Sequence, residues 1–463
     1  NKFIFFTVDT KYVIAIEIGS SKIRAALGTV DASGILSIKA IEEEPLTESV
    51  RYGQVRNVIQ VSDTIRRIMN RLQSRESSHS ISGVYIAFGG LSMRSERKTQ
   101  QHMFPTEQQI VQAHIDELAK NVVTASIPGR DIVDVHPCGF YVDRRKTSKP
   151  VGTYGRTIDG EFTVISANNS LKINLNRVFD ILSLKVLGYV VRPIAEADLV
   201  LMSDEKRAGC MLVDFGAETT TVVIYKDGNL VYLNTIPLGS RNITLDITRV
   251  CHIEEQAEER KINLSLYQGS APANILNFDA NSEKDMAEIK NLVNARTGEI
   301  IANILEQIRY ASLTNEDLPA GIIVVGSGAR LHGFNDRLEA VSRLSVRAGL
   351  INNKSVRISD SRIDPTNAID VISILADVKD RDVSCMQPVK QTEIPLTEKP
   401  EQQQIPTMGG KKTYTKPVEE ESEEYDDIDE EQPQKKNFFV NILKSVKQRV
   451  AIYVSEDDDN NNE

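Results

Sequence analysis

The stretch Ile-Ala-Ile-Glu-Ile-Gly-Ser-Ser-Lys at residues 14–22 has a counterpart much later in the chain. This is Leu-Val-Asp-Phe-Gly-Ala-Glu-Thr-Thr-Thr at residues 212–221. In each stretch an apolar run ends at an acidic residue, a glycine and small hydroxyl residues follow, and a second apolar run comes next. This pattern predicts two strand–turn–strand hairpins. Glycine lets the backbone approach a ligand closely, and exposed turn amides bind anions. The duplication therefore favours a clamp for a polyphosphate over two ordinary hairpins.

The residues expected to contact phosphate groups are small, carry a hydroxyl group or carry a positive charge. They are Gly19, Ser20, Ser21, Lys22, Gly216, Thr219 and Thr220. The acidic residues Glu17 and Asp214 end the two first strands, where carboxylates can hold Mg²⁺ through water. For Lys22 the alternative is an ordinary surface lysine at the end of a hairpin.

A third glycine-rich turn follows a buried-type strand at residues 322–325, and a helix is predicted from residue 334 to residue 344. The turn contains Gly326, Ser327, Gly328 and Ala329. A glycine turn in front of a helix N-terminus suits an anion or the sugar and base of a nucleotide. The chain has neither the dinucleotide-binding glycine fingerprint nor the P-loop motif, which disfavours Rossmann dehydrogenases and P-loop enzymes.

The order of these elements resembles the actin/Hsp70/sugar-kinase superfamily, and within it the FtsA family of bacterial cell-division proteins. Local matches lie at residues 18–23, 193–197, 236–247 and 255–261, and the resemblance covers roughly residues 12–378. It implies a bilobed α/β actin-like ATPase fold with ATP and Mg²⁺ in the cleft. It also implies that the three glycine turns are two phosphate hairpins and an adenosine-binding turn.

The resemblance adds Gly239 to the expected nucleotide site and places Glu258 and Lys261 near the ribose and base, although an intrahelical ion pair fits these two equally well. The chain departs from the superfamily at two positions. Glu17 stands where aspartate is usual, and Arg192 stands where efficient ATPases carry a glutamate or glutamine that orients water. Guanidinium stays protonated and is no base. We therefore expect ATP binding with slow hydrolysis at most.

The net charge of −10 is unevenly distributed. Residues 387–434 hold 13 acidic and 5 basic residues, residues 435–454 hold five basic residues and no acidic one, and residues 455–463 carry −5. Residues 1–386 are nearly neutral at −2, which does not favour binding to nucleic acid. The four cysteines have neither paired nor metal-type spacing, as in a protein of a reducing compartment.

The basic segment near the C-terminus predicts an amphipathic helix that lies in a membrane interface. Its expected membrane contacts are Lys435, Lys436, Phe438, Phe439, Ile442, Leu443, Val446, Lys447, Arg449, Val450 and Tyr453. The preceding segment is rich in Gln, Pro and Glu and poor in large apolar residues, which predicts a disordered linker. The alternative is a helix that packs back on the body or binds a partner.

The predicted organisation has seven parts. Residues 1–80 and 167–208 form the first lobe, and residues 81–166 form an inserted subdomain of the FtsA type. Residues 209–386 form the second lobe, residues 387–434 the linker, residues 435–454 the membrane-targeting helix and residues 455–463 an acidic tail.

The expected function is that of a self-assembling, ATP-binding protein that attaches the FtsZ ring to the cytoplasmic face of the inner membrane at the division site. The expected partners are the FtsZ C-terminal tail at the second lobe, further copies of the chain, other division proteins at the inserted subdomain, and anionic lipid. Two alternatives stay open, a pilus-type actin-like scaffold and a sugar or metabolite kinase. The chain shows no convincing general base, which disfavours the kinase.

Overall fold

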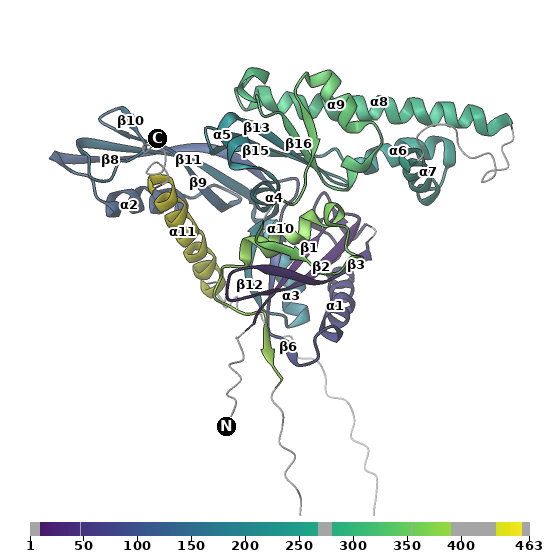
Figure 1. Cartoon of the computed structure of the whole chain (residues 1–463), viewed down its shortest axis with the longest axis horizontal. Helices are drawn as coiled ribbons and strands as arrows, with labels where there is room; N and C mark the ends of the chain where they lie inside the picture. Colours follow the sequence, from purple (N-terminus) through teal and green to yellow (C-terminus); the bar gives the residue numbers. More distant parts are fainter. Residues whose placement is uncertain (1–9, 47, 267–279, 353, 390–431, 456–463) are drawn as a thin grey trace, which may run out of the picture.

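A computed structural model describes residues 10–46, 48–266, 280–352, 354–389 and 432–455 (Figure 1). Two sheets with the same internal order form the two lobes. In the first sheet β12, β7, β1, β2 and β3 are neighbours in that order, and in the second β17, β16, β13, β14 and β15 repeat it. In both sheets three antiparallel strands are followed by two parallel ones. The fold is therefore a duplicated α/β unit, as predicted.

The strands of the first sheet are β12 (Val186–Val191), β7 (Val84–Phe88), β1 (Lys11–Ile18), β2 (Lys22–Val30), β3 (Leu36–Pro45) and β18 (Val356–Ile358). The matching strands of the second sheet are β17 (Val346–Ala348), β16 (Ile322–Val325), β13 (Cys210–Phe215), β14 (Thr220–Lys226) and β15 (Asn229–Ile236). Short strands β4 (Val50–Arg51) and β5 (Gln54–Val55) form one pair, and β6 (His79–Ile81) and β19 (Met386–Pro388) form another.

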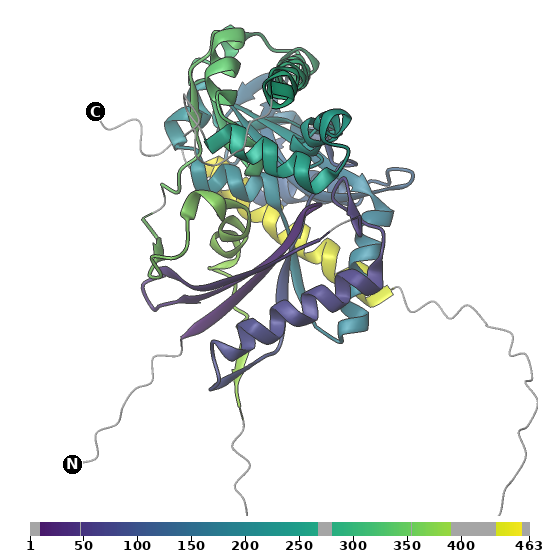
Figure 2. The ribbon, with the colours of Figure 1, turned by 90° about the vertical axis from the view of Figure 1, so that its right-hand side faces the viewer.

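Both sheets are covered on two sides. Helices α1 (Val58–Ser74) and α3 (Asn169–Leu182) pack together beneath the first sheet, as Figure 2 shows for α1. Helices α4 (Arg192–Val200) and α10 (Ile369–Val378) lie between the lobes (Figure 1). The outer side of the second sheet carries α6 (Ser240–Cys251), α8 (Ala280–Tyr310) and α9 (Phe334–Ser342), with α7 (Glu254–Leu266) packed on α6. Helix α5 (Ser203–Ala208) leads into β13.

Strand β13 shows why the deciding sequence has no alternation of polar and apolar residues. Leu212 faces the core shared with the first lobe, whereas Val213 and Phe215 face the core under α6, α8 and α9. A strand that is buried on both faces is continuously apolar. Asp214 is the one acidic residue of β13, and it stands near the C-terminal end of the strand.

The inserted subdomain extends the second sheet through a single pair between β15 and β8, Asn234 opposite Arg94. Its elements are β8 (Arg94–Gln109), α2 (Gln112–Val123), β9 (Arg130–Val142), β10 (Arg145–Thr147) and β11 (Tyr154–Asn168). The sequence pattern predicts a helix at residues 114–121 and a strand at residues 133–142, which correspond to α2 and β9, but it predicts neither of the long strands β8 and β11. Strand β8 is mostly polar and exposed, so it lacks the apolar signal on which strand prediction depends.

Three predicted boundaries need correction. The sequence pattern predicts a helix at residues 172–187, whereas the observed α3 begins at Asn169 and ends at Leu182, where Ser183 takes a left-handed conformation with φ 51. It also predicts a connecting helix at residues 195–202, whereas the observed α4 begins at Arg192 with a proline in its first turn, a position that favours a helix start. Strand β19 extends to Pro388, inside the predicted linker, whose residues 390–431 lie outside the described part.

The C-terminal helix α11 (Gln432–Ser455) lies against the inserted subdomain, on β9 and α2 (Figure 1). Ile442, Val446 and Val450 are buried in this contact. The alternative in which the helix packs back on the body is therefore present in this structure. The side chains of Lys435, Lys436, Phe438 and Phe439 lie outside the described part, as do residues 456–463.

The entry into β13 gives a test of the fold. Gly209 has φ +111, and an added Cβ would lie 2.1 Å from the backbone oxygen of Asp317. Gly152 has φ +93 but open space around it. We expect Gly152→Ala to cost about 1–2 kcal/mol through its backbone conformation alone. Gly209→Ala should cost roughly 1–3 kcal/mol more through overpacking. Urea unfolding of both variants measures this difference, and equal losses would contradict the assigned contact.

Candidate functional site

The two predicted hairpin turns have the same backbone geometry. In the first, the amide of Gly19 donates to the carbonyl oxygen of Lys22 at 3.0 Å, and in the second the amide of Gly216 donates to that of Thr219 at 2.9 Å. A Cβ at either glycine would lie 2.9 Å from the same acceptor oxygen. The duplication seen in the sequence is thus preserved in atomic detail at the turns.

Both turns line one cleft between the lobes. The predicted site residues that line this cleft are Glu17, Gly19, Ser20, Ser21, Lys22, Asp214, Gly216, Thr219, Gly326 and Ser327. The three glycine turns, which are far apart in the sequence, therefore meet at one place.

Four predicted residues do not line this cleft, because each has a structural role behind a turn. The hydroxyl of Thr220 is buried and donates to the carbonyl oxygen of Leu238 at 2.7 Å. Gly239 lets α6 approach the second turn, since a Cβ there would lie 2.3 Å from the carbonyl oxygen of Ala217. Gly328 packs on the ring of Phe215, and Ala329 lies at the partly buried border of the second core. These four residues therefore lie behind the cleft lining in this structure, and their contact with a nucleotide stays a prediction.

Glu258 and Lys261 also lie outside the cleft lining and form the intrahelical ion pair that the sequence left open. The Lys261 ammonium contacts Glu258 at 2.7 Å and donates to the hydroxyl of Thr244 at 2.8 Å. Burial lowers the pKa of Lys261. Together these contacts join α7 to α6.

Arg192 occupies the centre of the cleft floor. Its guanidinium lies 2.7 Å from Asp214 and 2.7 Å from Glu196, and it approaches Glu17 at 3.9 Å. All three carboxylates are buried. The sequence analysis assigned Glu17 and Asp214 to a metal ion and missed Glu196. Its position one helical turn after Arg192 was the signal that could have identified it.

The carboxylates around Arg192 are strongly perturbed. Burial, reinforced by the charge of Asp370, raises the pKa of Glu17 to about 7 in spite of Arg192 and Arg24. Burial likewise raises the pKa of Glu196 and that of Asp214. One oxygen of Glu196 is buried without a hydrogen-bond partner. Burial thus raises the pKa of all three carboxyl groups, and the positive charge of Arg192 opposes that effect.

The expected Mg²⁺ does not fit this arrangement. Asp214 is bonded to Arg192, and the same guanidinium stands between Asp214 and Glu17. Among the residues that the structure describes, no group of three or more His, Cys, Asp and Glu side chains could hold a metal ion. The cation position between the hairpins is filled by a side chain.

Glu218 is a further residue that the sequence analysis missed, and it joins the lobes across the cleft. On the second turn, it accepts the amide of Tyr52 at 2.6 Å and pairs with Arg51 at 2.8 Å. In addition, the amide of Gly53 donates to the hydroxyl of Ser20 at 3.0 Å. The short β4–β5 loop therefore touches both turns. Any change in the separation of the turns must move this loop.

Comparisons with known proteins agree with the fold. The family model for cell division protein FtsA matches residues 211–368, and that for the SHS2 domain inserted in FtsA matches residues 90–166. The FtsA of Porphyromonas gingivalis is 31% identical over 374 residues, which is 79% of this chain and 76% of that protein. The FtsA of Borreliella burgdorferi is 26% identical over 373 residues, covering 76% and 87%.

A solved PilM–PilN type IV pilus biogenesis complex has a chain that superposes with a TM-score of 0.55 at 16% identity, covering 79% of this chain and 98% of its own. This likeness concerns the fold alone. The duplicated lobes, the inserted subdomain at residues 90–166 and the 31% identity to a relative along most of the chain lead to one conclusion. The chain belongs to the FtsA family of actin-like cell-division proteins.

Proposed function

We propose that the cleft binds ATP, with the phosphates between the two hairpin turns. The proposal rests on one observation. Two hairpin turns with the same backbone hydrogen bond line one cleft together with a third glycine turn. Free turn amides and hydroxyls bind anions, and a low-dielectric cleft strengthens each such contact. The predicted Mg²⁺ is left out of this proposal, because Arg192 already bonds Asp214.

Turnover of ATP at this site should be slow. The carboxylate closest to the expected water-orienting position is Glu196, and it is bonded to Arg192. A base must be able to accept a proton from water, and a carboxylate held by a guanidinium is a poor one. The protein is thus proposed as a nucleotide-controlled assembly unit with at most weak ATPase activity.

We further propose that α11 attaches the protein to the cytoplasmic face of the inner membrane at the division site and that the second lobe binds the FtsZ tail. Helix α11 supports the first part, since it combines an apolar stripe with five basic residues between residues 435 and 454. The family supports the second part. No helix within the described residues is long and apolar enough to cross a membrane, so α11 would lie in the interface.

Self-assembly belongs to the same proposal. One short amphipathic helix binds a membrane weakly, and several joined chains bind it far more tightly through their combined contacts. The inserted subdomain is proposed to contact neighbouring chains and other division proteins. A pilus-type scaffold remains the alternative, and it differs in that it does not bind FtsZ.

Lys22 tests the nucleotide site. Its ammonium lines the cleft and pairs with Glu43 at 3.1 Å. A charged hydrogen bond to a phosphate contributes about 1.5–3 kcal/mol, so Lys22→Gln should weaken ATP binding by roughly 10–100-fold. The matched control is Lys39→Gln, which removes an exposed lysine from β3 of the same sheet. Isothermal titration calorimetry measures both, and equal affinity of Lys22→Gln and wild type contradicts the site.

Substitutions in α11 test whether this helix attaches the protein to a membrane. Burial of one large apolar side chain contributes roughly 1.5–3 kcal/mol, so Val446→Glu should abolish sedimentation with anionic vesicles at any salt concentration. Lys447→Gln should weaken it by about 1 kcal/mol, and only at low salt. FtsZ added to the mixture should sediment with vesicles together with the wild-type protein but not with Val446→Glu. Vesicle binding without FtsZ would favour the pilus-type scaffold, and intact binding of Val446→Glu would disprove the anchor.

A further inference from the structure

The apolar face of α11 is already occupied in this structure. Val446 and Val450 are fully buried and Ile442 nearly so, in one cluster with residues of α2 and β9. We call this surface of the subdomain, which includes Ile115, Leu118, Val135 and Phe140, the helix-docking face. The ring of Tyr453 packs edge-on against Phe140 at 5.7 Å, and its hydroxyl donates to the carbonyl oxygen of Cys138 at 3.3 Å.

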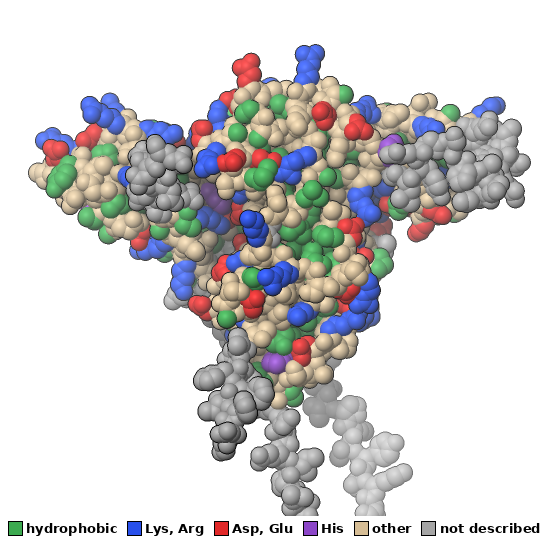
Figure 3. Space-filling view, in the orientation of Figure 1, with side chains coloured by type: hydrophobic (Ala, Val, Ile, Leu, Met, Phe, Trp, Pro, Cys, Tyr) green, Lys and Arg blue, Asp and Glu red, His purple; other side chains and the backbone are tan. Residues whose placement is uncertain are grey.

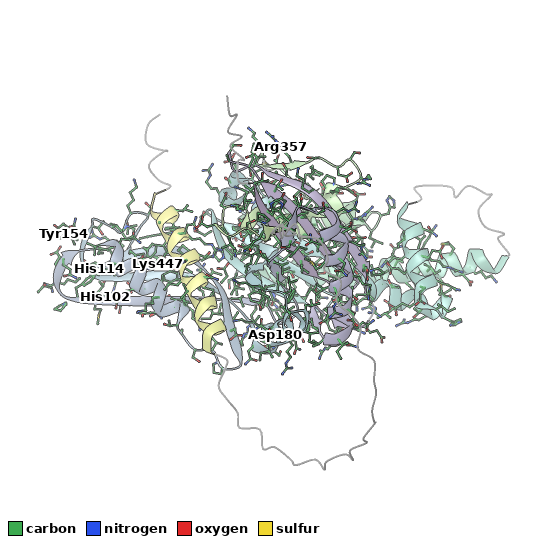
Figure 4. All side chains as sticks on the ribbon, turned by 90° about the horizontal axis from the view of Figure 1, so that it is seen from below. His102, His114, Tyr154, Asp180, Arg357 and Lys447 are labelled. Carbon is green, nitrogen blue, oxygen red and sulfur yellow. The ribbon has the colours of Figure 1, made fainter. Side chains whose placement is uncertain are left out.

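Two ion pairs fix the register of the docked helix. Lys447 contacts Asp116 of α2 at 2.7 Å, and Figure 4 shows Lys447 on the side of α11 near this subdomain. Arg449 pairs with the buried Asp134 of β9 and donates to the carbonyl oxygen of Val135 at 3.2 Å. Burial would raise the pKa of Asp134, but Arg449 and His136 hold it below its usual range. The face is thus complementary to α11 in shape and in charge.

The residues that are buried here are the ones that the membrane proposal needs. Ile442, Val446 and Val450 cannot contact lipid and the subdomain at the same time. We propose that the helix-docking face is the receptor for the chain's own C-terminal helix, so that docking on the subdomain and insertion into the membrane compete. This inference rests on the proposed membrane role of α11.

Competition has a measurable consequence. Only molecules with a released helix can bind the membrane. The apparent membrane affinity is therefore the affinity of the released helix multiplied by the fraction of molecules in which it is released. Changes on the subdomain should therefore alter membrane binding although they leave the sequence of α11 untouched. A helix without a docked state would not respond to such changes.

The test uses Asp134→Asn and Asp116→Lys in the full chain. Each removes one ion pair from the docked state, so each should raise the vesicle-bound fraction at limiting anionic lipid by about fivefold and speed amide exchange at residues 440–453 without lipid. Glu107→Lys, an exposed charge reversal on β8, controls for the added positive charge. If Asp134→Asn fails to fold, the surface variant Asp116→Lys decides.

The outcomes separate the two proposals. Unchanged exchange and unchanged sedimentation in both variants would overturn docking. Faster amide exchange in α11 with an unchanged vesicle-bound fraction would support docking but overturn its competition with membrane binding. If neither wild type nor variant sediments, the membrane role fails, and the competition fails with it.

A second inference comes from Arg192 and is independent of α11. The guanidinium stands between the acidic ends of the two first strands, within 2.7 Å of Asp214 and 3.9 Å of Glu17. We infer that Arg192 serves as the cation of this cleft, so that the nucleotide phosphates are neutralised by a side chain and their binding does not require Mg²⁺. This inference deepens the proposed ATP site and rests on it.

Calorimetry of ATP binding in EDTA and in excess Mg²⁺ tests this inference. The wild-type dissociation constant should differ by less than about threefold between the two conditions, whereas Arg192→Met should bind weakly in EDTA and recover at least about tenfold with Mg²⁺. Loss of wild-type binding in EDTA alone would overturn the role of Arg192. Absence of binding in both conditions would overturn the ATP site itself. The wild-type comparison stands even if the variant does not fold.

Discussion

The balance of charge around Arg192 is the constraint on which the cleft depends. Three carboxylates from β1, α4 and β13 converge on one guanidinium, and all of them are withdrawn from water. A buried ion cluster of this kind is costly to form and still more costly to leave unpaired. The two lobes can approach each other here only because Arg192 supplies the missing positive charge. The duplicated hairpins form two sides of the cleft, and the guanidinium of Arg192 lies between the acidic residues of their first strands.

Charged groups nearer the surface also form ion pairs, as Arg67 and Arg71 do with Glu44. On the face shown in Figure 3, acidic and basic side chains alternate over both lobes and the subdomain. At physiological ionic strength salt screens such charges over about 8 Å, and surface ion pairs contribute little to stability individually. Asp214 in the cleft and Asp134 at the helix-docking face differ from them, because both are buried.

The sequence was sufficient for the hairpins because their signal is local. An apolar run, an acidic residue and a glycine determine each turn, and Gly19 and Gly216 have the predicted role. The long strand β8 was missed, since a polar strand is stabilised by its neighbours in the sheet and not by its own pattern. Strand β11 was missed although its second half is buried. Glu218 was missed for a similar reason, since its partners Arg51 and Tyr52 come from a distant segment. Glu196 differs, because its spacing from Arg192 was a signal in the sequence that was overlooked. Thr220 and Lys261 contact other parts of the protein in this structure, because a motif specifies a backbone and not the direction of each side chain.

Helices α4 and α10 connect two distant places in the molecule. At their N-terminal ends, Arg192 and Asp370 line the cleft. Toward their C-terminal ends stand Asp198 and Asp377, whose negative charges, after that of Asp134, raise the pKa of Arg449 on α11. These two helices pack against each other as one block. A shift of that block by a bound phosphate would change the field at Arg449 without any contact between the ligand and α11. Helices α4 and α10 thus connect the lining of the cleft with the surroundings of Arg449 through one packed block.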